Sequence, residues 1–140
     1  MVDYLGIPFY AIQSIKEGAG WTTADGRVVP HERLVFPAEA PRRYAYCSDT
    51  TYLPRLADYV KGVDLLFHEA TFGEDNRARA AETFHSTAKQ AAMLARDAGV
   101  KRLLIGHYSA RYTDERVLLD EAREMFPETQ LAEEGMVLPI

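Results

Sequence analysis

The chain has 140 residues, of which 47% are hydrophobic, and it carries a formal net charge of −5 at pH 7. This length and apolar content suit one globular domain. The acidic balance argues against a simple basic nucleic-acid-binding module. Because no apolar run is long enough to cross a bilayer, no membrane partner is expected. Cys47 is the single cysteine, which excludes an internal disulfide and a cysteine-based zinc site and favours the cytoplasm or another reducing compartment.

We expect residues 1–140 to form a single domain, in which residues 1–40 are a variable segment of hairpin and loop. Glycine and proline interrupt any regular hydrophobic period in the first twenty residues. Asp25-Gly26 predicts a tight turn between two strands. The elements expected here are a helical turn, the two hairpin strands and a third short strand, at 10–16, 21–23, 27–29 and 34–36.

Residues 41–140 are predicted to form an α/β core that carries the chemically interesting motifs. Short apolar runs predict buried strands, and apolar residues at helical spacing predict helices between them. The expected order is β-α-β-α-α-β-α-β-β, with helices covering one mixed sheet. The expected strands are 44–47, 63–68, 102–106, 129–131 and 136–138. The expected helices lie between Pro54 and Gly62, over 74–83, from a Ser86 or Thr87 cap to Gly99, and from a Thr113 cap to Pro127.

One predicted helix has an unusual face made of small side chains. Four alanines recur at helical spacing, which lets a helix approach a sheet closely: Ala88, Ala91, Ala92 and Ala95. We interpret this face as a packing surface.

Three of the predicted strands end in ionisable residues. The first is followed by Asp49, the second ends at His68 and Glu69, and the third is followed by His107. Because ligands of α/β sheets bind in the crevice at the carboxyl ends of the strands, these side chains are expected at one edge. Aspartate, glutamate and histidine offer the oxygen and nitrogen ligands that zinc accepts.

His85, just before a predicted helix, is a fourth candidate for this edge. Each candidate also has an ordinary structural interpretation. Asp49 or Glu69 can cap the segment that follows it, and His68 can be a buried hydrogen-bonding support, the interpretation we favour for that residue. The recurrence of the pattern nevertheless favours a functional site that contains Asp49, His85 and His107.

Four motifs occur in an order that resembles one enzyme family. They are Ser48-Asp49-Thr50, Phe-His-Glu-Ala-Thr-Phe at 67–72, His-Ser-Thr-Ala-Lys-Gln-Ala-Ala at 85–92 and Gly-His-Tyr-Ser-Ala-Arg-Tyr at 106–112. In order and spacing they resemble the C-terminal half of ribonuclease Z, the tRNA 3′-processing endonuclease of the metallo-β-lactamase superfamily. The resemblance is dense over 44–140 and weaker over 2–36.

The resemblance implies a fold, a cofactor and a set of roles. The fold would be half of an αββα sandwich, and the complete enzyme would hold two zinc ions and cleave precursor tRNA. Asp49 would bridge the two zinc ions and His107 would bind one of them. The two catalytic residues would be His85 and Glu69. His85 would protonate the leaving 3′ oxygen, and we expect Glu69 to orient the His85 side chain. The residues expected to contact phosphate, as substrate-binding residues, are Ser109, Arg111 and Tyr112.

The resemblance also has gaps. The superfamily motif His-x-His-x-Asp-His and a basic arm that grips tRNA are absent from the sequence. Because two ligands cannot hold two zinc ions with useful affinity, we expect this chain to be a fragment that binds no zinc ion firmly and is inactive alone. Half of a two-sheet sandwich leaves an apolar face uncovered, so self-association, as a homodimer, is expected.

Two other interpretations of the chain stay open. The same scaffold can serve another phosphodiesterase or a sulfatase-like hydrolase, with Arg111 binding a small anionic ester. Alternatively, the chain is a non-catalytic dimerisation module. Separately, Arg111 can pair with Asp114 or Glu115 instead of contacting phosphate.

Overall fold

The computed structural model describes residues 5–140, and the chain divides into two compact units at Pro41 and Arg42. The division expected from the sequence, between residues 40 and 41, lies next to this boundary. The expectation that both units belong to one domain stays a prediction.

The first unit contains a hairpin and short helical turns. The 3-10 turn η1 (Phe9–Ala11) continues into helix α2 (Ile12–Lys16), which confirms the predicted helical turn. Strands β1 (Trp21–Thr22) and β2 (Val28–Val29) pair antiparallel, as the hairpin prediction requires. The strand expected at 34–36 is wrong. The 3-10 turn η2 (His31–Arg33) precedes this segment. The His31 carbonyl accepts the N–H groups of Leu34 and Val35, at 2.8 and 3.2 Å, so these N–H groups cannot pair in a sheet.

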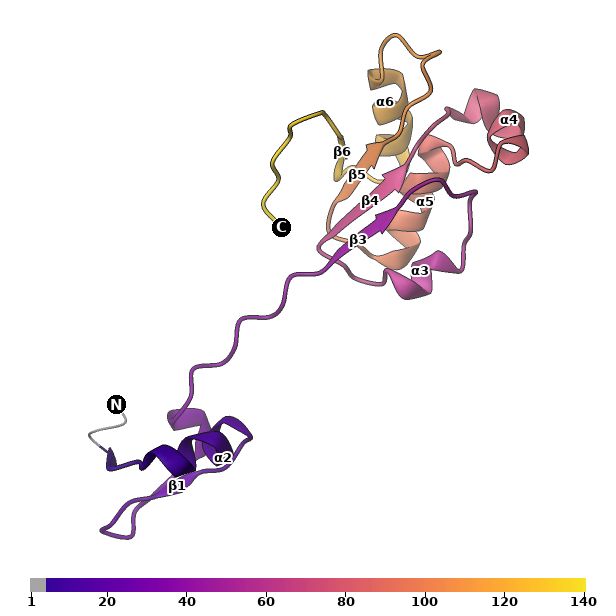
Figure 1. Cartoon of the computed structure of the whole chain (residues 1–140). Helices are drawn as coiled ribbons and strands as arrows, with labels where there is room; N and C mark the ends of the chain where they lie inside the picture. Colours follow the sequence, from indigo (N-terminus) through magenta and orange to yellow (C-terminus); the bar gives the residue numbers. More distant parts are fainter. Residues whose placement is uncertain (1–4) are drawn as a thin grey trace. The chain divides into compact units, whose positions relative to one another are not determined.

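The second unit is a four-stranded sheet with helices packed on one face (Figure 1). Its strands lie in the order β3-β4-β5-β6, and every neighbouring pair is parallel. The strands are β3 (Tyr44–Cys47), β4 (Leu65–Glu69), β5 (Leu103–Gly106) and β6 (Thr129–Leu131). The helices are α3 (Leu56–Tyr59), α4 (Arg77–Glu82) after the 3-10 turn η3 (Glu74–Asn76), α5 (Ala88–Ala98) and α6 (Arg116–Met125). None of the helices in residues 5–140 is long and apolar enough to span a membrane.

The α/β prediction is confirmed, with three corrections of detail. The sheet is parallel rather than mixed, because each link between neighbouring strands contains a helix and residues 136–138 form no closing strand. Thr113 does not cap the last helix. Helix α6 begins at Arg116, whose N–H is accepted by the Asp114 carboxylate at 3.0 Å.

Helix α5 is the centre of the core. It begins with a capping box, in which Thr87 and Gln90 each accept the backbone N–H of the other, and it ends at Gly99 with φ of 61°. The alanine face predicted from the sequence is fully buried against the sheet and α6: Ala88, Ala91, Ala92 and Ala95. This close contact fixes the helix on the sheet and therefore places the loop that precedes it.

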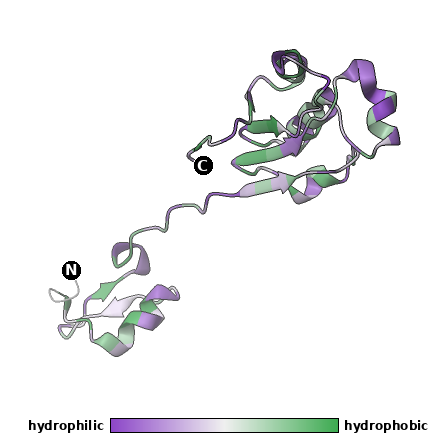
Figure 2. Cartoon of the chain, turned by 45° about the horizontal axis from the view of Figure 1, so that its top comes forward, coloured by the Kyte–Doolittle hydropathy of each residue, from purple (hydrophilic) through white to green (hydrophobic). Residues whose placement is uncertain are grey.

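No helix of this unit covers the opposite face of the sheet (Figure 1), and several of the strands are coloured hydrophobic in Figure 2. Tyr46, Phe67 and Leu104 are directly paired in register across β3, β4 and β5. The Tyr46 ring stacks on Phe67 with centroids 4.5 Å apart, yet Tyr46 remains 63% exposed. This apolar sheet face is what one layer of a sandwich presents to a second layer.

The close contact of α5 generates a stability prediction. Ala91→Leu places three extra carbons where no space exists, and we expect a loss of about 1–3 kcal/mol in the free energy of unfolding, measured by urea denaturation. The matched control is Ala81→Leu on the exposed side of α4, which is expected to stay within about 0.5 kcal/mol of the parent. Equal effects of the two substitutions would contradict the packing role of the alanine face.

Candidate metal site

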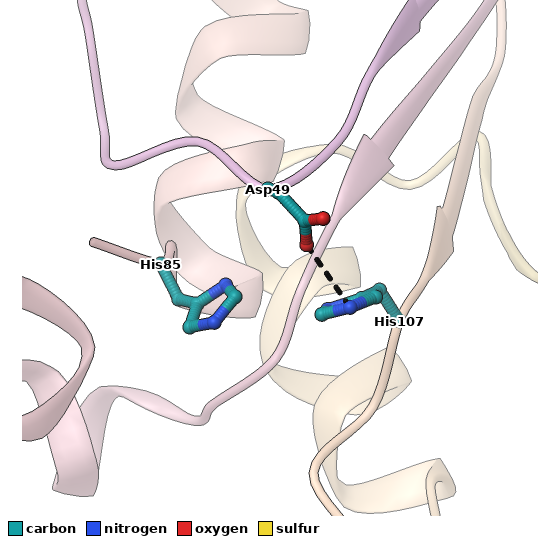
Figure 3. A group of neighbouring side chains, drawn as sticks. All are labelled: Asp49, His85 and His107. Carbon is teal, nitrogen blue, oxygen red and sulfur yellow. Dashed lines mark ion pairs between the residues drawn. The ribbon is translucent and has the colours of Figure 1, made fainter. Parts of the chain in front are cut away.

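Asp49, His85 and His107 converge at the carboxyl edge of the sheet (Figure 3). They follow β3, precede α5 and follow β5, respectively. One ligand atom from each lies within 4.8 Å of the others. The closest pair is His107 Nε2 and Asp49 Oδ1, 3.0 Å apart, and the two imidazole centroids are separated by 5.2 Å.

The backbone is strained at this edge. Asp49, Phe84 and His107 have φ of 50°, 60° and 61°, and they are the non-glycine residues with positive φ in the described part of the chain. Side chains other than glycine rarely adopt this region, and such strain concentrates at functional sites. Two of the three are candidate site residues and the third directly precedes His85. Each left-handed residue turns the chain sharply where a strand or helix ends, which aims the candidate side chain at the common point.

Glu69 is fully buried and contacts one of the three side chains, His85, directly. Its Oε1 accepts the backbone N–H of Thr50 and the Nδ1–H of His85, both at 2.8 Å. Its Oε2 accepts the hydroxyl of Thr71 at 2.6 Å and the backbone N–H groups of Thr71 and Ser86, at 3.3 and 3.2 Å. These five donors compensate the desolvation of the buried carboxylate.

The donor atoms of the site suit a divalent metal ion. Because Nδ1 of His85 donates its proton to a carboxylate, the neutral form of the ring keeps its lone pair on Nε2. An imidazole nitrogen and a carboxylate oxygen as close as those of His107 and Asp49 share either a proton or a cation. Ligands lie about 2.0–2.2 Å from zinc, so two ligands of one ion are roughly 3.0–3.5 Å apart, in agreement with the 3.0 Å seen here. Asp49 and His107 are 71% and 44% exposed, so an ion can reach them.

His68 lies outside this site. Successive side chains of a strand point to opposite faces, so His68 enters the helix-covered face while Glu69 faces the site. His68 is fully buried, and its Nδ1 lies 2.7 Å from the Glu69 backbone carbonyl. Burial lowers the pKa of its imidazole, so it stays neutral. His68 is thus buried and makes one hydrogen bond, which agrees with a buried support, and its role as a support stays a prediction.

Arg111 lies beside the site with its charge free for a ligand. Its Nη1 donates to Asn76 Oδ1 at 2.7 Å, and its guanidinium lies 5.1 Å from the centre of the Phe72 ring. That ring is in turn 6.2 Å from the His85 imidazole. Among the described residues Arg111 forms no ion pair, so the alternative of a pair with Asp114 or Glu115 is wrong.

Ser109 and Tyr112 shape the loop that carries Arg111. The Ser109 backbone N–H donates to the Thr71 carbonyl at 3.1 Å. The Tyr112 hydroxyl accepts the backbone N–H of Gly73 at 2.7 Å. Both residues therefore hold this loop beside the segment after β4, and their contact with phosphate stays a prediction.

Sequence reasoning missed the part played by Thr71. Its hydroxyl lies 2.6 Å from Glu69 Oε2 and 2.9 Å from His107 Nδ1. The available signal is its position two residues after Glu69, which in an extended chain returns a side chain to the same face. A threonine after a strand is also common for purely structural reasons, so its position alone does not predict a part in the site.

The chain that carries this site is similar in sequence to one protein family and to several named proteins. The model of the Beta-lactamase superfamily domain matches residues 20–108. The chain is 56% identical over 140 residues to a protein named Ribonuclease Z from Phocaeicola vulgatus, and 56% identical over the same length to one from Parabacteroides distasonis. It is 55% identical over 134 residues to another of that name from Porphyromonas gingivalis. The resemblance to ribonuclease Z seen in the motifs is therefore confirmed.

The chain spans less than half the length of these relatives. It covers 45%, 46% and 44% of them, respectively, whereas 100%, 100% and 96% of the chain is matched. Among solved structures, the metallo-beta-lactamase fold protein YhfI from Bacillus subtilis is similar with a TM-score of 0.63 and 26% identity, over 67% of this chain and 38% of that one. This likeness confirms the predicted fold class.

The burial of His68 generates a pH prediction. Since its pKa in the folded chain is lowered from 6.5, the unfolded chain takes up a proton that the folded chain does not. Stability is therefore complete above about pH 6.5 and falls as the pH drops below it, by up to about 1.4 kcal/mol per pH unit from this group. His68→Asn keeps a hydrogen-bond donor but does not titrate.

The measurement is the free energy of unfolding of parent and His68→Asn between about pH 8 and pH 5. The other histidines are common to both proteins, so the difference in slope isolates His68. Parallel pH profiles for the two proteins would contradict a neutral, buried His68.

Proposed function

The chain belongs to the Beta-lactamase superfamily, and from this premise we propose that it is part of a zinc-dependent endoribonuclease that removes 3′ trailers from precursor tRNA by phosphodiester hydrolysis. The observation that carries the proposal is the convergence of Asp49, His85 and His107 within 4.8 Å at the edge of the sheet. Because the chain spans 45% of the Phocaeicola vulgatus relative, the activity is proposed for the complete protein. The single cysteine supports a cytoplasmic location.

Asp49 and His107 are proposed to hold zinc. Their facing oxygen and nitrogen are 3.0 Å apart and accessible, and a carboxylate has a second oxygen with which to reach a second ion. The remaining ligands for two zinc ions would come from the rest of the complete protein. Bound zinc would supply Lewis-acid stabilisation of the phosphodiester oxygens.

His85 is proposed to act as the general acid. Glu69 holds its Nδ1–H at 2.8 Å, so the proton available for transfer is carried on Nε2, on the side of the site. As the bond between phosphorus and the 3′ oxygen breaks, Nε2 gives its proton to that oxygen. The attacking water forms the new P–O bond and loses one proton to bulk solvent. The buried carboxylate of Glu69 accepts the hydrogen bond from Nδ1 and so fixes the direction of the imidazole ring.

Arg111 is proposed to bind the phosphate. Its guanidinium is held by Asn76 and Phe72 and has no carboxylate partner among residues 5–140, so it can offer two parallel donors to phosphate oxygens. Ser109 and Tyr112 belong to the same loop and are proposed as further contacts. A net charge of −5 repels RNA at long range, so this local cation, together with zinc, has to provide the attraction.

The test is a chimera in which this chain replaces the matching segment of the Phocaeicola vulgatus ribonuclease Z. We expect the chimera to cleave a precursor tRNA at the 3′ trailer and the isolated chain to leave it intact. His85→Ala in the chimera should lower kcat by about 10²–10⁴-fold with little change in KM, because it removes proton transfer and not binding. His31→Ala, in the first unit, is the matched histidine control and should retain activity.

The chimera also separates the alternatives. Chelation should abolish cleavage and added zinc should restore it, and Asp49→Asn should prevent this recovery. Hydrolysis of a small phosphodiester without cleavage of tRNA would favour a different hydrolase. A folded, zinc-supplied chimera that cleaves neither substrate would favour the non-catalytic interpretation.

We further propose that the isolated chain self-associates through its apolar sheet face, with a second copy as the occupant. Tyr46, Phe67 and Leu104 present a continuous apolar row, and Tyr46 is 63% exposed. Tyr46→Lys should raise the dissociation constant of the dimer by about tenfold or more, measured by analytical ultracentrifugation. Tyr59→Lys, at an 82% exposed tyrosine on α3, is the control. A parent chain that stays monomeric at high concentration would contradict the proposal.

A further inference from the structure

We propose that Thr71 is a positioning residue, which extends the orienting action of Glu69 from His85 to His107. One buried carboxylate would then set the direction of both imidazoles, one directly and one through a hydroxyl group. The significance of this arrangement for catalysis rests on the proposed function. The arrangement itself rests on the hydrogen bonds among Glu69, Thr71, His85 and His107.

The direction of each hydrogen bond follows from a count of protons. The Thr71 hydroxyl has one hydrogen and lies 2.6 Å from Glu69 Oε2, an atom that only accepts. The hydroxyl therefore donates to the carboxylate. Its oxygen, 2.9 Å from His107 Nδ1, is left to accept, so His107 carries its hydrogen on Nδ1.

The tautomer decides what His107 presents to the site. With the hydrogen on Nδ1, the Nε2 lone pair faces Asp49 Oδ1 at 3.0 Å, where a cation can be shared. Without a cation, the Asp49 side chain, which is 71% exposed, has room to turn away from this lone pair. With the hydrogen on Nε2, the ring would donate to Asp49 and offer no lone pair to a metal. The Nδ1–H tautomer thus prepares the His107 ring as a ligand before any metal binds. The other oxygen of Glu69 selects the same Nδ1–H tautomer in His85.

Thr71 is held firmly enough to impose this choice. Its backbone N–H donates to Glu69 Oε2 at 3.3 Å, and its carbonyl accepts the Ser109 N–H at 3.1 Å. The residue is 6% exposed, so water has little room to replace its hydroxyl. Reversing the hydroxyl would leave its oxygen facing a buried carboxylate oxygen at 2.6 Å, a repulsive contact without a proton between them.

The structural alternative is that Thr71 only fills space. Two variants distinguish the roles. Thr71→Val has nearly the same shape and lacks the hydroxyl, whereas Thr71→Ser keeps the hydroxyl and lacks the methyl group. A packing role predicts that serine is the more harmful change, and a positioning role predicts that valine is.

The experiment is ¹⁵N NMR of the imidazole nitrogens in this chain, without metal, at about pH 8.5, where imidazoles are neutral. With four histidines in the sequence, the signals can be assigned by single substitutions. We expect His107 to be the Nδ1–H tautomer in the parent and in Thr71→Ser, and to change to mainly Nε2–H in Thr71→Val. His85, which contacts Glu69 directly, reports whether the site remains folded.

The outcomes divide cleanly. A His107 tautomer that follows the hydroxyl supports the proposal. The same tautomer in both variants, or a change in both, overturns it, because the hydroxyl then does not set the ring. This measurement needs no activity, so it stands apart from any failure of the proposed function.

A second measurement connects the tautomer to metal binding. In the chimera, Thr71→Val should weaken zinc affinity by about 10–100-fold, measured by competition with a chelator, and Thr71→Ser should stay close to the parent. Equal zinc affinities in the parent and both variants would overturn the claim that this hydroxyl prepares His107 as a ligand.

Discussion

The buried carboxylate of Glu69 is the interaction on which the candidate site depends. It lies at the end of β4 with no exposed surface, and five hydrogen-bond donors compensate its desolvation. Those donors come from the segment after β3, from the turn after β4 and from the loop before α5. Removing a hydrogen-bond partner from a buried, ionised carboxylate costs much free energy, so Glu69 holds these three segments together. The positions of the functional side chains are therefore set by the positions of these three segments.

The parallel sheet and the strained backbone act together to aim the side chains. Parallel strands bring all their carboxyl ends to one edge, which is why residues separated by tens of positions meet there. An extended strand end would still point Asp49 or His107 away from the common point. The left-handed conformations at these residues turn the chain locally, and the packed sheet and helices behind them hold this strain. The alanine face of α5 contributes by seating the helix close to the sheet, so that His85 reaches the edge.

The uncovered face of the sheet and the incomplete ligand set have a common explanation. Tyr46 and Phe67 stack where a second layer would pack, and the triad offers three ligand atoms where two metal ions need more. Both observations agree with a chain that spans less than half of its relatives. The remainder of such a protein would cover the face and complete the site at the same time, since the site lies at the rim of that sheet.

The sequence alone determined the strands β3 to β6, the Gly99 end and the alanine face of α5, and the identity of the three converging residues. These features depend on local periodicity and on where polar residues interrupt apolar runs. It could not determine that the sheet is parallel throughout, that Met136–Leu138 stays irregular or that α6 starts at Arg116, since strand pairing and helix ends depend on neighbours distant in sequence. The link through Thr71 and the pairing of Arg111 with Asn76 were decided only by the tertiary structure. A hydrogen bond requires two groups within about 3 Å, and no spacing along the chain encodes that distance between segments so far apart.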